Sequence, residues 1–206
     1  IVQRRMKYLE DSNIKIHLNT EIGKDIQFSD LQKKHDAVLI ATGVYKAKEI
    51  SLEGDASDVV PALDFLIASN RKGLGDNVEA FDNGLLNAKG KNVVVIGGGD
   101  TAMDCVRTAI RQEAKSVKCL YRRDKENMPG SAREVNNAEE EGVEFLWQSL
   151  PKKIESDNSG NLLNCIKMKL SEPDSDGRRT PQEIAGSDFE LESDLVIAAL
   201  GFSPEN

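Results

Sequence analysis

A glycine-rich turn between an apolar run and an amphipathic segment constrains the fold of this chain more than any other feature. Four β-forming residues, Val93–Ile96, come directly before the turn Gly97-Gly98-Gly99-Asp100-Thr101-Ala102. Residues 101–112 then carry apolar side chains at helical spacing. A bare GxGxxG pattern has low specificity, but a strand before it and a helix after it are typical of a Rossmann-type unit. The sequence therefore predicts a parallel α/β fold.

The small residues of this turn each have a physical task. Gly97 permits the tight turn, Gly99 lets the backbone approach a pyrophosphate, and Ala102 lets the helix pack closely on the strands. Free N–H groups at the start of the helix would face the phosphate charge. The pattern favours a bound dinucleotide, with a ligand-free glycine turn as the alternative. The residues predicted to contact it here are Gly97, Gly98, Gly99, Asp100, Thr101 and Ala102.

The end of the next strand indicates which dinucleotide is bound. An acidic residue there would accept the ribose hydroxyls of NAD, but the predicted strand 117–121 ends on Tyr121 and is followed by Arg122 and Arg123. Guanidinium groups suit a ribose 2′-phosphate, which they bind with paired charge-assisted hydrogen bonds. NADPH is thus favoured over NADH. Arg133, early in the predicted helix 132–141, is either a third contact or a solvent-exposed arginine.

The rest of the chain surrounds this unit with further helices and strands. Helices are expected at 2–11, 28–34 and 62–69, a strand at 14–18, and loops at 72–92. Two continuous apolar runs, 36–43 and 194–201, are typical of strands buried on both faces. Residues 143–147, 152–155, 162–170 and 189–191 predict a small antiparallel meander.

Composition excludes several classes of protein. The formal charge of −8 argues against a nucleic-acid partner, and no stretch approaches the roughly 20 apolar residues needed to cross a membrane. The cysteines, Cys105, Cys119 and Cys165, are odd in number and form no CxxC pair. They are interpreted as buried thiols in a reducing compartment, which makes a cytoplasmic location the expectation, and no metal site is predicted.

No catalytic acid or base stands out. Tyr121 and Lys125 imitate the Tyr-x-x-x-Lys pair of short-chain dehydrogenases, but they lie where the adenosine end of a nucleotide would bind. His17 and His35 are isolated in the sequence and are interpreted as structural or exposed. The prediction is that the chain has no catalytic residue of its own.

The central motifs also carry a family resemblance. The stretches VVVIGGGDTAMDCVRTAIRQ and CLYRRDKENMPGSAREVNNAEEEGVEF, with weaker matches at DAVLIATG and DLVIAALGFSPE, resemble the small (beta) subunits of NADPH-dependent glutamate synthase. These are flavoproteins in which an NADPH domain is inserted into an FAD domain. The resemblance implies a partial FAD-domain segment at 1–43, an NADPH-binding domain at 44–194, and a strand returning to the FAD domain at 195–206.

The same resemblance implies a function. NADPH would give a hydride to FAD, and electrons would pass through iron-sulfur clusters to a large (alpha) subunit that makes glutamate. Cofactors carry that chemistry, which accounts for the lack of an acid–base pair. By this resemblance residues 98–101 hold the pyrophosphate, Arg122 and Arg123 hold the 2′-phosphate, and Gly201 lies near the nicotinamide side.

Parts of the family pattern are missing. The chain has no N-terminal FAD-binding GxGxxG, no cysteine-rich cluster segment and no final Gly-Asp motif, and it opens on Ile1 in mid-pattern. We therefore expect this chain to be a piece of a longer protein. The chain alone should bind FAD weakly or not at all, although the longer protein would bind it. Thioredoxin reductases share the arginine pair, but their CxxC is absent here.

Two alternative functions stay open. One is the input module of another NADPH, FAD and iron-sulfur enzyme, similar to dihydropyrimidine dehydrogenase or ferredoxin-NADP transhydrogenase. The other is an NADPH-sensing module without turnover. The stretch NMPGSAREV favours glutamate synthase.

Overall fold

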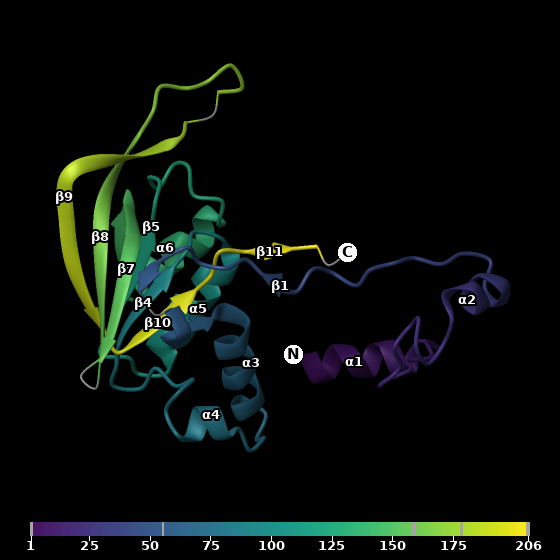
Figure 1. Cartoon of the computed structure of the whole chain (residues 1–206). Coiled ribbons are helices and arrows are strands. Elements are labelled where there is room, and N and C mark those ends of the chain that lie inside the picture. The colour runs from purple at the N-terminus through teal and green to yellow at the C-terminus, as the bar shows by residue number, and fades with distance from the viewer. Residues whose placement is uncertain (1, 55, 158–159, 178, 205–206) are drawn as a thin grey trace. The chain divides into compact units, whose positions relative to one another are not determined.

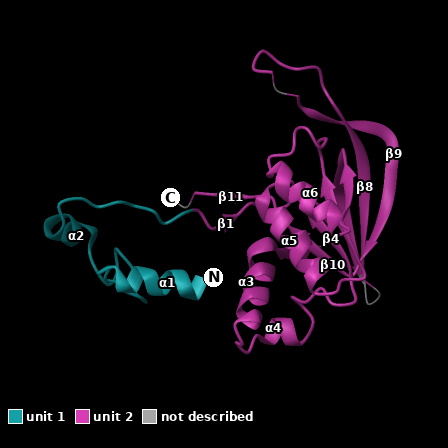
Figure 2. Ribbon diagram, turned by 180° about the vertical axis from the view of Figure 1, so that it is seen from behind, with its two compact units in different colours: residues 1–43 teal, residues 44–206 magenta. Residues whose placement is uncertain are grey.

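The chain forms two compact units, residues 1–43 and 44–206, which are described separately (Figure 2). The structure is a computed structural model, and it describes residues 2–54, 56–157, 160–177 and 179–204. Among these residues, no helix combines the length and the apolar character that a membrane crossing requires.

Unit 1 contains two helices, α1 (Val2–Asp11) and α2 (Phe28–Lys34), and both were predicted. The apolar side chains of α1 that recur at helical spacing are exposed, with Val2 at 74% and Leu9 at 44%. An amphipathic helix gains most of its stability from burying its apolar face. Within unit 1, α1 therefore lacks the packing that its sequence pattern is suited to.

The two strands predicted in unit 1 are wrong. Residues 14–18 and 36–43 have no strand structure, and Leu39 and Ile40 are 90% and 69% exposed. A strand needs a neighbour that accepts and donates its backbone hydrogen bonds. The described part of unit 1 contains only an isolated bridge between Ile22 and Ile26. The apolar pattern thus indicates residues suited to burial, but the described part of unit 1 provides no layer that covers them.

Unit 2 is built on a parallel sheet of five strands in the order β3-β10-β4-β5-β6. Each neighbouring pair runs in parallel. The strands are β3 (Val59–Pro61), β10 (Leu195–Ala198), β4 (Asn92–Ile96), β5 (Ser116–Tyr121) and β6 (Glu144–Trp147). The predicted parallel sheet is confirmed, although 143–147 was assigned to the antiparallel meander. That assignment is wrong because β6 pairs with β5 in parallel. The apolar pattern of a short strand does not reveal which strand it pairs with.

Helices cover one face of this sheet, as Figure 1 shows. They are α3 (Ala62–Gly73), α5 (Asp100–Arg111) and α6 (Ala132–Glu140), with the short α4 (Glu79–Asp82) and the 3₁₀ turn η1 (Ala56–Asp58) in the connections. Val93 and Val95 of β4 belong to the core shared with these helices, whereas Val94 and Ile96 belong to a second core. Alternate residues of a strand point to opposite faces, so β4 is buried on both.

A second sheet, in the order β2-β7-β8-β9, supplies residues to that second core. It consists of β2 (Glu53–Gly54), β7 (Ser149–Asp157), β8 (Gly160–Leu170) and β9 (Pro181–Ser193). The β7–β8 and β8–β9 pairs are antiparallel, which confirms the predicted meander for these strands. β8 begins at Gly160, before its predicted start at 162. β9 extends far beyond 189–191, because residues 181–188 are mostly exposed and lack an apolar signal.

The two ends of unit 2 lie side by side. β1 (Lys46–Ala47) pairs antiparallel with β11 (Phe202–Ser203), which Figures 1 and 2 both show. A domain that enters and leaves at one place is suited to insertion into another. Unit 1 ends at Gly43, and β10 is an inner strand of the unit 2 sheet. The assignment of 1–43 and 195–206 to an FAD domain stays a prediction.

Candidate nucleotide-binding site

The glycine turn follows β4 at the carboxyl edge of the parallel sheet, where nucleotides bind in doubly wound folds. Gly97 has φ +148°, and a Cβ added there would lie 2.2 Å from the carbonyl oxygen of Ala199, just after β10. Its N–H donates to the carbonyl of Leu120 in β5 at 3.1 Å. Gly97 is therefore a glycine because three strands meet around it.

The next two glycines differ in their surroundings. A Cβ on Gly98 would lie 2.4 Å from the ring of Tyr121. Gly99 is the N-cap of α5, with φ −92° and ψ 177°, and an added Cβ would meet nothing within 4 Å. The fold thus accounts for Gly97 and Gly98 but leaves open space at Gly99. This space fits the close approach of a phosphate to the backbone.

The first turn of α5 completes the phosphate side of the site. Ala102 is fully buried, and its N–H donates to the carbonyl of Gly99 at 2.9 Å. Its small side chain allows the helix to lie close to the sheet. Thr101 is half-buried and Asp100 is exposed. Backbone N–H groups at such a helix start attract anions.

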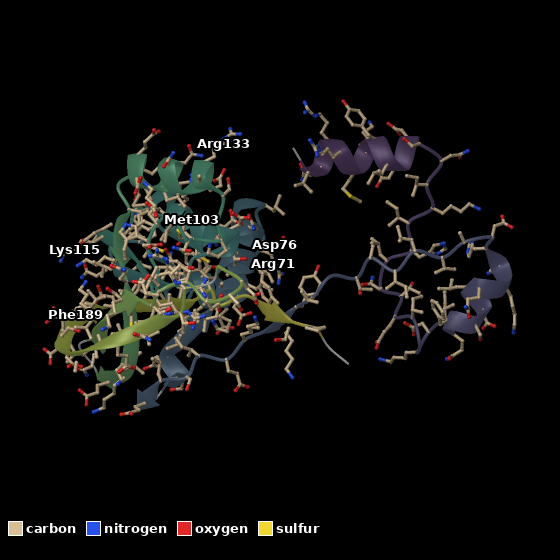
Figure 3. All side chains as sticks on the ribbon, turned by 90° about the horizontal axis from the view of Figure 1, so that it is seen from above. Arg71, Asp76, Met103, Lys115, Arg133 and Phe189 are labelled. Atoms are coloured by element: carbon tan, nitrogen blue, oxygen red, sulfur yellow. The ribbon has the colours of Figure 1, made fainter. Side chains whose placement is uncertain are left out.

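The two arginines that follow β5 lie beside this turn, because β5 is the neighbour of β4. Arg122 is exposed, and Arg123 is half-buried with a buried Nε that has no hydrogen-bond partner. Arg133, in the first turn of α6, points outward from its helix (Figure 3). A buried N–H without a partner is costly, and an anionic ligand would satisfy it.

Two arginines of α5 form ion pairs. Arg107 of α5 binds Glu141 at 2.7 Å and also binds Glu134, and Arg111 binds Glu141 at 3.0 Å. In the described part of the chain, no such carboxylate partner is found for Arg122, Arg123 or Arg133. Arg122, Arg123 and Arg133 are therefore available to an anion, as a 2′-phosphate contact would require.

The segment after the arginine pair folds back on the glycine turn, which sequence reasoning missed. The N–H of Gly130 donates to the carbonyl of Gly98 at 2.9 Å, and the N–H of Ser131 donates to Oδ1 of Asp100 at 2.8 Å. The Pro129-Gly130 turn was a local signal for a bend. The contact partners were not readable from local sequence, because Ser131 and Asp100 lie 31 residues apart in the chain.

Tyr121 and Lys125 each have a different partner. The Tyr121 hydroxyl donates to the carbonyl of Asn127 at 3.0 Å, and the Lys125 ammonium binds the carboxylate of Glu139 at 2.7 Å. Burial raises the pKa of Tyr121, which disfavours its phenolate. Its ring instead packs on Gly98 and meets Trp147 edge to face.

The cysteines are buried free thiols, as predicted. Burial raises the pKa of Cys119 and that of Cys165 to about 12. The Cys119 thiol donates to the carbonyl of Gly97 at 3.4 Å, and this buried hydrogen bond supports the glycine turn. The described residues contain no cluster of three or more metal-ligating side chains.

The remaining candidates lie as follows. Gly201 comes shortly after β10, has φ +85°, and accepts a hydrogen bond from the N–H of Lys48 at 3.0 Å. It shares the carboxyl edge of the sheet with Gly97, on the side opposite to β5. His17 and His35 are exposed in unit 1. A nicotinamide contact at Gly201 stays a prediction.

Two cavities lie at the other edge of the sheet, near the amino ends of its strands. Their walls share Gly160, Asn161 and Asp194, and neither includes a residue of the glycine turn. Parallel sheets bind nucleotides at the carboxyl ends of their strands. We therefore place the candidate site at the open surface around Gly99 and the arginines.

Comparison with known proteins decides the family. A family model described as pyridine nucleotide-disulphide oxidoreductase matches residues 1–206. The chain belongs to this family. Its α/β fold and its place among oxidoreductases, both predicted, are thereby confirmed.

Individual relatives agree with this assignment. The chain is 56% identical to the glutamate synthase [NADPH] small chain of Azospirillum brasilense, over 100% of this chain and 43% of that protein. It is 38% identical to the NADPH-Fe(3+) oxidoreductase subunit beta of Geobacter sulfurreducens, over 100% of this chain and 30% of that protein. The chain thus spans less than half the length of these relatives.

A solved structure confirms the fold. FprA of Mycobacterium tuberculosis in complex with NADPH matches with a TM-score of 0.76 and 16% identity, over 100% of this chain and 58% of that one. The predicted resemblance to glutamate synthase small subunits is also confirmed as a similarity of sequence.

Proposed function

We propose that this chain is the NADPH-binding part of an electron-input subunit, and that the whole protein serves glutamate synthase. The observation that carries the proposal is the set of unpaired arginines beside an open glycine turn. Arg122 and Arg123 follow the strand next to that turn, at the edge of the sheet where a dinucleotide lies. The similarity to glutamate synthase small chains supports the identity of the larger enzyme.

Each part of the edge has its own role toward NADPH. The backbone of residues 98–101 would receive the pyrophosphate, and the guanidiniums of Arg122 and Arg123 the 2′-phosphate, with Arg133 as a further cation. Gly201 would lie toward the nicotinamide. Bound NADPH supplies a hydride, whereas the protein binds and orients the cofactor.

The acceptor belongs to the larger protein. The one glycine turn described at the carboxyl edge of the sheet is assigned to NADPH, so we place most of the FAD site outside this chain. FAD, the iron-sulfur clusters, the large (alpha) subunit and a cytoplasmic location are therefore proposed for the whole protein. If the proposal is correct, the whole protein purified without added cofactor is yellow with a flavin spectrum.

Calorimetry on this chain tests the nucleotide assignment. NADPH should bind clearly more tightly than NADH. In the double variant Arg122→Ala/Arg123→Ala, NADPH affinity should fall by about 10- to 100-fold, the range expected for lost charge-assisted hydrogen bonds. NADH affinity should change little, because NADH has no 2′-phosphate.

Arg111→Ala is the matched control, since Arg111 is an exposed arginine of the same unit that already pairs with Glu141. Its NADPH affinity should match that of the unaltered chain. Equal affinities for NADPH and NADH in the unaltered chain would contradict the assignment of Arg122 and Arg123 to the 2′-phosphate.

A different electron acceptor is the second candidate function. The 38% identical relative from Geobacter sulfurreducens is named for Fe(3+), so a chain of this type occurs in a protein with another acceptor. Assays of the whole protein with 2-oxoglutarate and glutamine, against ferric iron, would separate the two. A protein that binds NADPH but reduces no acceptor would instead be a sensor.

A further inference from the structure

The segment Arg122–Ser131, here termed the arginine loop, is fastened to the glycine turn at more than one point. Gly130 N–H donates to the Gly98 carbonyl at 2.9 Å. A Cβ added to Gly130 would lie 3.0 Å from that same oxygen, so only glycine permits this approach without a shift. The Tyr121 hydroxyl, bonded to Asn127 at 3.0 Å, ties the middle of the loop to the end of β5.

Asp100 makes the contact at the end of the loop. Its Oδ1 accepts the N–H of Ser131 at 2.8 Å. Ser131 is the N-cap of α6, and Arg133 lies in the first turn of that helix. Asp100 itself lies in the first turn of α5. One carboxylate thus stands at the start of two helices, where negative charge is favourable.

The charge of Asp100 argues against a direct role in binding phosphate. A carboxylate repels a pyrophosphate, so its side chain would weaken binding if it faced the ligand alone. Its hydrogen bond to Ser131 instead joins the part of the site that holds the pyrophosphate to the part that carries the cations. A selective effect on the 2′-phosphate is therefore expected.

We propose that Asp100 is a positioning residue that sets the preference for NADPH over NADH, by holding the arginine loop and the start of α6 against the glycine turn. This inference rests on the proposed function. The pyrophosphate is common to both cofactors, and only NADPH has the 2′-phosphate. Loosening the loop therefore weakens NADPH binding while leaving most of the NADH affinity. A merely structural role of Asp100 would weaken both to the same extent.

The hydrogen bond can be removed from either side. Asp100→Ala removes the acceptor. Ser131→Pro removes the N–H donor, and the φ of Ser131, −57°, already suits proline. Calorimetry of the whole chain should show NADPH affinity reduced by at least about tenfold in each variant, as for the loss of a charge-assisted bond, with NADH reduced less than about threefold. The double variant Asp100→Ala/Ser131→Pro should bind NADPH no more weakly than whichever single variant binds it more weakly, because both changes remove the same bond.

Three matched variants should keep the preference. Asp100→Asn retains an accepting oxygen at the same position. Ser131→Ala retains the N–H, and the Ser131 hydroxyl makes no capping hydrogen bond. Asp104→Ala removes an exposed carboxylate of α5 one turn further on. Circular-dichroism melting of each variant shows whether it folds. Asp100→Ala and Ser131→Pro remove the same hydrogen bond, so if one of them does not fold, the other still tests the proposal.

The outcomes separate this inference from the proposed function. It is overturned if Asp100→Ala and Ser131→Pro leave the NADPH to NADH ratio unchanged while Arg122→Ala/Arg123→Ala lowers it. It is also overturned if both cofactors weaken equally. If the arginine variant itself leaves the ratio unchanged, the proposed function fails and this inference with it.

Discussion

Gly97 and Gly99 are glycines for different physical reasons, and alanine substitutions separate them. Gly97→Ala should destabilise the fold by about 1–3 kcal/mol, because its φ of +148° is strained for alanine and the added Cβ would meet the Ala199 carbonyl. Gly99→Ala should cost less than about 1 kcal/mol, since its φ is ordinary and its surroundings are open.

NADPH affinity should fall in both variants, by about tenfold or more in Gly99→Ala because the methyl group occupies the space of the phosphate. Urea unfolding and calorimetry measure the two quantities. Unchanged NADPH affinity in a stable Gly99→Ala variant would contradict the assigned role of that space.

The cysteines provide a second test at the scale of single residues. Cys105, Cys119 and Cys165 are buried, and burial raises the pKa of each thiol, to about 12 for Cys119 and Cys165. Thiolates are the reactive form, so the folded chain should react very slowly with Ellman's reagent at pH 8. All 3 thiols should react in denaturant. Rapid reaction of the folded chain would show that this core opens.

At the scale of elements, Arg107 joins α5 to the end of α6. Its guanidinium donates to Oε1 of Glu141, the C-cap of α6, at 2.7 Å from one amino group and 2.9 Å from Nε. The hydrogen bond from Arg107 lowers the pKa of Glu141. A carboxyl whose pKa is lower in the folded state stabilises the fold above its unfolded pKa, and this stabilisation is lost as pH falls through the folded pKa.

Glu141→Gln should therefore lower the free energy of unfolding by about 1 kcal/mol at pH 7. The difference from the unaltered chain should shrink as pH falls below about 4.3, the ordinary pKa of glutamate. Urea unfolding at pH 7 and at acid pH measures this, with the exposed neighbour Glu140→Gln as control. A difference that persists at the lowest pH would mean that packing, and not charge, stabilises the helix pair.

The elements also show where sequence patterns succeed. The strand before Gly97 and the helix after it were predicted closely, because both depend on local periodicity and a turn motif. Residues 36–43 have the same apolar texture as 194–201, yet only the second run forms a strand. Its neighbours β3 and β4 lie within unit 2, whereas the described part of unit 1 offers the first run no neighbour.

At the scale of the whole molecule, unit 2 should fold without unit 1. Both of its cores are made of residues after Gly43, and its ends are joined by the β1–β11 pair. A chain of residues 44–206 should show a cooperative melting transition by calorimetry. It should also bind NADPH with the affinity of the whole chain, within about twofold. A chain that melts without a cooperative transition would show that unit 2 depends on the preceding residues.

The sequence by itself determined the Rossmann-type unit and its candidate cofactor. Both depend on residues close together in the chain: a buried strand, a turn that needs small residues, and two arginines after the next strand. Only the tertiary structure decided that β6 joins the parallel sheet, that Arg122, Arg123 and Arg133 lack carboxylate partners among the described residues, and that Asp100 holds the N–H of Ser131. Those facts depend on contacts between residues far apart in the chain, which local patterns do not specify.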